Sequence, residues 1–91
     1  MPKYMVERYL PGITGDQLTA AAKKAKSTTA QLTQEGTPVR YLRSTFIPGE
    51  EKCFCLFEGP SEEVVRQANE RAQIPFERIL EAEFITAEEL S

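Results

Sequence analysis

The run from Lys52 to Glu58 constrains this chain most, because it is the most apolar stretch of the sequence and turn-forming residues bound it. Residues 53–57 are all apolar, whereas Pro48-Gly49 precedes the run and Gly59-Pro60 follows it. A short apolar run of this kind is typical of a strand that is buried on both faces. The run therefore predicts a central strand of a sheet, and the other elements can be placed relative to it.

Helix-capping and turn signals divide the rest of the chain into five further elements. Thr14 and Gln17 form a capping-box pattern at the start of the first helix, and Gly36 ends it. Ser61 is a favourable cap for the second helix, which Pro75 stops. The predicted order is strand 4–10, helix 15–35, strand 39–47, strand 52–58, helix 62–74 and strand 78–85, with a polar tail at residues 86–91.

This order of elements predicts an α+β fold of the ferredoxin-like βαββαβ type. In such a fold four strands form an antiparallel sheet in the spatial order 4-1-3-2, and both helices cover one face. The third strand of the sequence is central in that order, which agrees with the apolar run at residues 52–58. We expect a single ferredoxin-like domain over residues 1–91, because a chain of this length has no room for a second core.

Charge and composition argue against several classes of function. The net charge is −3 and charges of both signs are interspersed, so no basic stripe is available to bind nucleic acid. No apolar run approaches the length of a membrane span and the first residues do not begin a signal peptide, so we expect a cytoplasmic protein with no membrane partner. The sequence has no histidine, which removes the usual general base and favours a non-catalytic role.

Two cysteines, Cys53 and Cys55, lie within the central run. As residues i and i+2 of one strand they point to the same face, where a disulfide between them would distort the strand. A thiolate metal pair would need further soft ligands that the chain lacks. We therefore interpret both cysteines as small buried side chains.

Short motifs along the chain recur in the same order in one protein family. They are Val6-Glu7-Arg8, Pro11-Gly12, Arg40-Tyr41-Leu42, Cys55-Leu56-Phe57-Glu58-Gly59-Pro60, Ala72-Gln73-Ile74-Pro75 and Arg78-Ile79. On these motifs the chain resembles a small ferredoxin-like domain family of unknown function that includes a nickel-binding protein. The resemblance runs over nearly the whole chain, and it implies a homodimer.

The chain departs from this family at two positions where relatives often carry histidine. Arg43 stands at one of these positions and Ala68 at the other. A nickel site that relies on imidazole therefore cannot be carried over to this chain, and we predict no resident cofactor. A divalent metal held by oxygen ligands, such as the carboxylates of Glu7 and Glu58, stays open as an alternative, with a preference for hard cations.

Strand alternation divides the predicted sheet into a face that packs on the helices and an open face. The expected helix-facing set is Val6, Leu42, Phe46, Cys53, Cys55, Phe57, Leu80, Ala82 and Phe84. The expected open-face set is Met5, Glu7, Tyr9, Tyr41, Arg43, Thr45, Phe54, Leu56, Glu58, Ile79, Glu81, Glu83 and Ile85. Soluble monomers seldom expose so many apolar side chains on one face, which predicts a homodimer through the helix-free face of the sheet.

The same face gathers charges and tyrosines that form the candidate ligand site. Pairing Ile47 with Lys52 across the hairpin sets Arg43 opposite Leu56, within diagonal reach of Glu58. We take the first and third strands as parallel neighbours, so that Glu7 lies at the same end of the sheet as Glu58. The predicted ligand-binding residues are Glu7, Tyr9, Tyr41, Arg43, Glu58 and Glu81.

Two interpretations of this cluster follow, and each implies a different function. In the first, the charges form an ion-pair network inside a dimer interface, because structural networks gather charges as functional sites do. In the second, they line a pocket for a small ligand or an ion. We expect a homodimeric ligand- or metal-binding domain. The alternatives are a small cofactor-independent enzyme, of the isomerase or monooxygenase type, and a purely structural dimerising module.

Overall fold

The computed structural model describes residues 1–90 and contains four strands, two long helices and two short 3₁₀ turns. The elements are β1 (Lys3–Tyr9), α1 (Gly15–Gln34), β2 (Arg40–Ile47), a 3₁₀ turn (Pro48–Glu50), β3 (Lys52–Glu58), α2 (Glu62–Ala72), β4 (Arg78–Ala82) and a 3₁₀ turn (Ala87–Glu89). Their order confirms the predicted ferredoxin-like βαββαβ fold.

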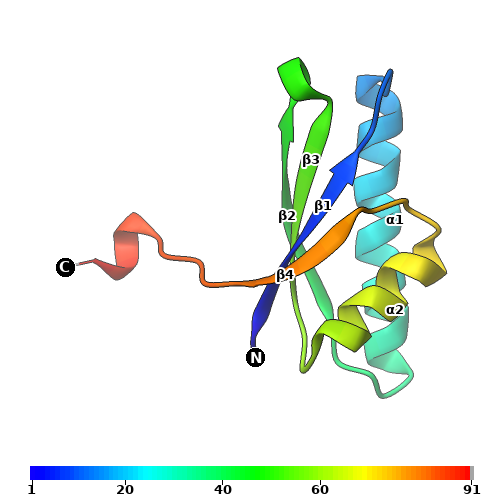
Figure 1. Ribbon diagram of the computed structural model, residues 1–91. Coiled ribbons are helices and arrows are strands. Elements are labelled where there is room, and N and C mark those ends of the chain that lie inside the picture. The colour runs from blue at the N-terminus through cyan, green and yellow to red at the C-terminus, as the bar shows by residue number, and fades with distance from the viewer. Residues whose placement is uncertain (91) are drawn as a thin grey trace.

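The four strands form one antiparallel sheet in the order β2-β3-β1-β4. This is the predicted spatial order, with the apolar β3 between two neighbours. Figure 1 shows the sheet nearly edge-on, with α1 and α2 together on one of its faces. The assumption that β1 and β3 run parallel is wrong, because Lys3 pairs with Glu58 and Tyr9 pairs with Lys52. Glu7 and Glu58 therefore lie at opposite ends of the sheet.

Both helices begin at the predicted caps and α1 ends just before Gly36, whereas α2 ends at Ala72, earlier than predicted, with Gln73 rather than Pro75 terminating it. The Thr14 hydroxyl accepts the backbone N–H of Gln17, and the Gln17 side chain accepts the N–H of Thr14, which completes the capping box. The Ser61 hydroxyl likewise accepts the N–H of Val64 at the start of α2. The core lies between the helices and the sheet. Its buried apolar members are Tyr4, Val6, Ala25, Leu32, Val39, Cys53, Cys55, Phe57, Val65, Ala68, Ala72, Ile74 and Ile79.

The β2–β3 hairpin has the predicted register near its turn and an irregularity at its far end. Ile47 pairs with Lys52 and Arg43 pairs with Leu56, as expected. Between Tyr41 and Arg43 the register shifts by one residue, because a bulge absorbs Leu42. The prediction that Tyr41 lies on the open face is wrong, since its ring packs at 65° against Phe57 at a centroid distance of 5.5 Å, within the core.

The alternation of β4 is opposite to the prediction. Ile79 is buried in the core opposite Val6, whereas Leu80 is 44 % exposed on the open face. Glu81 pairs with the core residue Tyr4, and so belongs to the helix-facing side of this edge strand rather than to the open face. The signal was ambiguous because two apolar residues, Ile79 and Leu80, are adjacent in the sequence.

The chain leaves the sheet earlier than predicted. β4 ends at Ala82, and residues 83–90 form a segment that we call the C-terminal arm. Figure 1 shows that this arm projects away from the sheet on the side opposite to the helices. Residues 87–89 form a single 3₁₀ turn within the predicted tail, and Ser91 lies outside the described residues.

Candidate functional site

Among the predicted site residues, Glu7 has a carboxylate with two cationic hydrogen-bond partners. Its carboxylate lies on the open face, where Oε1 accepts a hydrogen bond from Nε of Arg78 at 2.8 Å and Oε2 accepts one from Nζ of Lys52 at 3.1 Å. These two partners hold the pKa of Glu7 below its usual range, the Arg78 bond being the larger cause and the Lys52 bond the second. Tyr9 pairs with Lys52 at the same end of the face and is 49 % exposed.

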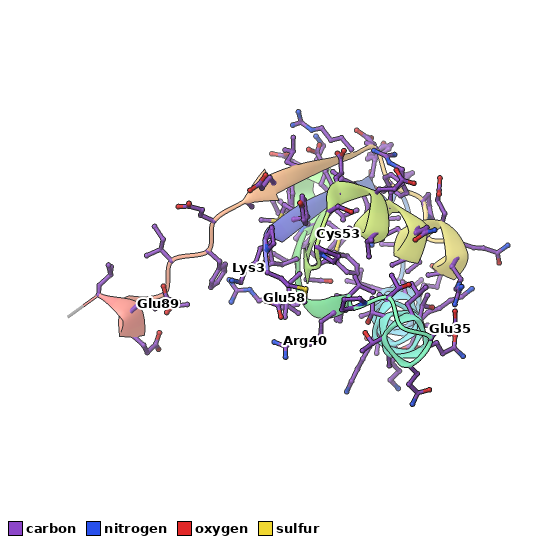
Figure 2. All side chains as sticks on the ribbon, turned by 90° about the horizontal axis from the view of Figure 1, so that it is seen from below. Lys3, Glu35, Arg40, Cys53, Glu58 and Glu89 are labelled. Carbon is purple, nitrogen blue, oxygen red and sulfur yellow. The ribbon has the colours of Figure 1, made fainter. Side chains whose placement is uncertain are left out.

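Glu58 lies at the opposite end of the face with different partners. Its Oε1 is 3.6 Å from Nε of Arg40, the residue that pairs with it across the β2–β3 ladder. Lys3 is its neighbour on β1. Figure 2 shows Lys3, Glu58 and Arg40 gathered at this end of the sheet. The charged residues of the open face thus form two separate groups rather than one cluster.

The remaining predicted site residues do not join either group. Arg43 lies on the open face, but its guanidinium stacks over the ring of Phe84 at 3.9 Å from the centroid instead of pairing with a carboxylate. Tyr41 points into the core, where its hydroxyl is 2.7 Å from Oγ of Ser44. Glu81 is exposed at the β4 edge. The structure therefore brings together Glu7 with Tyr9, and separates both from Tyr41, Arg43, Glu58 and Glu81.

A groove runs along the free edge of β2, between this strand and α1. Its volume is about 700 Å³, within the range of small-molecule sites, and its walls are mainly apolar with a few charged groups. Glu58, Tyr41 and Arg40 line it from the sheet, and Lys26 lines it from α1. Two of the predicted ligand-binding residues, Tyr41 and Glu58, therefore face a cavity, although not the one between two sheets that the sequence suggested.

A second group of polar residues lies on the helix side of the sheet, where sequence reasoning expected only packing. Arg8 is 2 % exposed, and it donates to Sγ of Cys55 at 3.3 Å and to the side chain of Asn69. It also donates to the backbone carbonyls of Ile74 at 3.4 Å and Pro75 at 3.3 Å. Its position, in phase with Tyr4 and Val6 on β1, was the available signal that it faces the core.

Comparison with known proteins now places the chain in a family. The family model described as "Nickel responsive protein SCO4226-like" matches residues 4–82. The chain belongs to this family. The match spans β1 to β4 and stops where the C-terminal arm begins, so it covers the whole sheet and both helices.

A solved structure supports the same family assignment. The chain is 27 % identical to the protein of "Crystal structure analysis of SCO4226 from Streptomyces coelicolor A3(2)", with a TM-score of 0.74. The alignment covers 92 % of this chain and 99 % of that chain. No curated protein matches the sequence.

The family description names nickel, so the chain's own residues must be tested as ligands. Among residues 1–90, no group of three or more histidine, cysteine, aspartate or glutamate side chains is placed to hold a metal ion. The sequence contains no histidine, and both carboxylate oxygens of Glu7 are bonded to Arg78 and Lys52. The described part of one chain therefore does not fit a nickel site.

Proposed function

We propose that the protein is a homodimeric binding domain that pairs through the open face of its sheet and acts by binding a small ligand rather than by catalysis. The observation that carries the proposal is the C-terminal arm, which points away from its own globule on the side where no helix covers the sheet (Figure 1). Beyond Phe84, which stacks on Arg43, the apolar side chains of Ile85 and Leu90 on the arm are largely exposed. A second copy offers it an apolar surface.

The arm and the open face both carry exposed apolar side chains, which could pack against each other in a dimer. Ile85 is 66 % exposed and Leu90 is 71 % exposed on the arm, whereas Leu80 and Ile47 are exposed on the sheet. Pairing two open faces would bury these side chains against the partner and leave the charged groups of Glu7 and Glu58 at the two ends of the sheet.

The groove along β2 is the site that we assign to the ligand. Its apolar walls would bury the body of a small amphipathic molecule, and Lys26 and Arg40 would attract an anionic group on it. Arg40 already contacts Glu58 at 3.6 Å, so an anionic ligand would compete with this carboxylate for the guanidinium. The two free thiols are compatible with a reducing compartment, and we place the protein in the cytoplasm.

Sedimentation velocity tests the dimer. We expect the full chain to sediment as a dimer at tens of micromolar, roughly the regime in which a standard interface persists, and a chain truncated after Ala82 to dissociate. Leu80→Lys should also produce a monomer, because it places a charge within the interface. Ala20→Lys, on the exposed side of α1, is the matched control and should remain dimeric. A monomeric full chain at these concentrations contradicts the dimer.

Nickel binding is tested separately by calorimetric titration of tag-free protein. We infer weak binding, because one chain offers neither imidazole nor a cluster of three ligands within residues 1–90. A submicromolar dissociation constant would contradict this inference. In that case the truncated chain distinguishes ligands shared across the dimer from ligands within one chain.

A further inference from the structure

Arg8 is a buried cation without a carboxylate partner. The guanidinium stays charged at any physiological pH, and burying an unpaired charge is costly. Among residues 1–90, Arg8 forms no ion pair with aspartate or glutamate, and its acceptors are two backbone carbonyls, Asn69 and the sulfur of Cys55. Of these four acceptors only the thiol can ionise. Cys55 is therefore the natural source of the missing negative charge.

Arg8 donates to the sulfur of Cys55, and two further groups that can donate lie beside it. Besides Arg8, the hydroxyl of Ser44 lies 3.0 Å from it and the thiol of Cys53 lies 3.7 Å from it. The Tyr41 hydroxyl is 2.7 Å from Oγ of Ser44 and can donate to it, which leaves the Ser44 proton free to point at Cys55. Such a set of donors suits a thiolate rather than a thiol.

These contacts act on the pKa of Cys55 as expected. The bond from Cys53 is the largest cause, burial opposes it, and the charge of Arg8 adds to it, so that the pKa of Cys55 falls to about 5. The pKa of Cys53 is raised, mainly because its thiol donates to Cys55. Of the two thiols, Cys55 is therefore the one whose ionised form these contacts favour.

A small cavity lies against this thiolate, between the sheet and α1. Its volume is about 30 Å³, enough for a molecule the size of water or hydrogen peroxide. Arg8, Ser44 and both cysteines form its polar wall. The opposite wall carries the small side chains of Ala21, Ala22 and Ala25 on α1, the first two only half-buried. A layer of small side chains therefore separates the thiolate from solvent.

We propose that Cys55 is a peroxide-reactive cysteine, whose thiolate attacks hydrogen peroxide within this cavity. The sulfur forms a bond to one peroxide oxygen while the O–O bond breaks, and the second oxygen leaves as hydroxide. The hydroxide takes up a proton from solvent and becomes water, so the sulfur is oxidised by two electrons and the peroxide is reduced by two. Arg8 and Ser44 lie where they stabilise the charge on the leaving oxygen.

The product is a sulfenic acid on Cys55 rather than a disulfide. Condensation with Cys53 would require a bond between residues i and i+2 on one face of a strand, which strains the backbone. The protonated Cys53 is also a poor nucleophile. The modification lies on the helix side of the sheet, apart from the proposed dimer face, and a sulfenic acid is chemically reversible once the chain opens to a thiol reductant.

The test compares the folded full chain with the same chain unfolded in urea at the same pH. After a fixed time catalase removes the peroxide, both samples are unfolded in urea that contains dimedone, and the trapped sulfenic acid is located by fragment-ion mass spectrometry. We expect hydrogen peroxide to label Cys55 at least about tenfold faster in the folded chain, because the folded chain holds the thiolate and stabilises the leaving oxygen. Iodoacetamide is too large for the cavity and should show the opposite order, with slower modification of the folded chain.

Variants separate this reaction from simple burial. Cys55→Ser should abolish labelling, whereas Cys53→Ser should retain it. Ser44→Ala removes one donor without touching Arg8, and should slow the peroxide reaction several-fold. Cumene hydroperoxide, which the cavity excludes, should react at least about tenfold more slowly than hydrogen peroxide. A folded chain that shields Cys55 from peroxide and iodoacetamide alike, or labelling at Cys53, overturns the proposal.

Discussion

The guanidinium of Arg43 stacks over the ring of Phe84 at 3.9 Å from its centroid, and this contact joins the open face of the sheet to the C-terminal arm. The two residues come from opposite edges of the sheet, since Arg43 belongs to β2 and Phe84 follows β4. The first residues of the arm therefore cross the open face before the rest of the arm projects away from it. The start of the arm is held by one cation–π contact at an accessible site.

Arg43→Ala should loosen the arm with little loss of stability. A cation–π contact at an exposed site is worth about 0.5–1 kcal/mol, and Arg43 pairs with no carboxylate among residues 1–90. We expect faster hydrogen exchange in the arm and a loss of at most about 1 kcal/mol in urea unfolding. Arg66→Ala is the control, because Arg66 makes the equivalent contact with Phe76 at 5.5 Å on the helix side. Unchanged exchange in the arm would contradict the role of Arg43.

Glu7→Gln should change how stability depends on pH. The pKa of Glu7 is lowered from 4.5, so its ion pairs stabilise the folded state above pH 4.5, and this contribution is lost as pH falls through the lower folded-state pKa. The stability difference between wild type and Glu7→Gln should be largest near neutral pH and shrink in acid. Glu70→Gln, at an exposed position of α2 without an ion pair among residues 1–90, is the matched control for the loss of one carboxylate. Urea unfolding between about pH 7 and pH 3 measures both.

Local sequence signals predicted the elements well, because each depends on neighbouring residues. The capping box of Thr14 and Gln17, the cap of α2 at Ser61 and the hairpin register from Ile47 and Lys52 are each set by residues a few positions apart. The order of the strands in the sheet followed from these signals together with the apolar run of β3, whereas the assumed parallel direction of β1 and β3 was wrong.

Features that depend on distant parts of the chain could not be predicted in this way. The bulge at Leu42 changes which face Tyr41 occupies, and no turn residue marks it in the sequence. The arginine in the core, Arg8, is satisfied by Asn69 and by backbone carbonyls more than sixty positions away. Arg8 is in phase with Val6 on β1, but it was not predicted to face the helices, and only the fold reveals acceptors for its charge.

Asn69→Ala should be strongly destabilising, because it removes a buried acceptor of the Arg8 guanidinium. Asn69 is 1 % exposed, accepts a bond from Arg8 and donates to the carbonyl of Val65 at 2.8 Å. Alanine would leave one N–H of a buried guanidinium without an acceptor, at a cost of about 2–4 kcal/mol. Gln67→Ala, at an exposed position of the same helix, should change stability by less than about 0.5 kcal/mol. Chemical denaturation of both variants decides this, and equal stabilities would mean that Arg8 finds another partner.

Asn69→Asp extends this experiment to the thiolate. An aspartate at this position would give Arg8 a carboxylate partner and reduce the need for charge on Cys55. The fold should survive better than in Asn69→Ala, whereas the ionisation of Cys55, followed by thiolate absorbance, should move to higher pH. An unchanged ionisation would show that Ser44 and Cys53 set the charge of Cys55 without Arg8.

Glu51 and Gln73 have backbones that favour glycine, and they form a matched pair for the last prediction. Both residues have a left-handed backbone conformation, with φ of 55° and 57°, and each is the C-cap of the helical segment before it. The left-handed conformation costs a residue with a side chain about 1–2 kcal/mol. Glycine removes this cost, but it also raises the conformational entropy of the unfolded chain, which offsets part of the gain in stability. Gln73→Gly should therefore raise the free energy of unfolding by about 0.5–1 kcal/mol.

Glu51→Gly gains the same backbone relief but loses an interaction that Gln73 does not make. The Glu51 carboxylate accepts the N–H of Gly12 at 2.7 Å, which joins the hairpin turn to the end of β1. A hydrogen bond to a charged group at an exposed site contributes about 1 kcal/mol, so the gain and the loss should nearly cancel. Urea unfolding of the two variants measures the difference directly. Equal stabilisation by both would show that the Glu51–Gly12 bond contributes nothing, and destabilisation by Gln73→Gly would contradict the backbone argument itself.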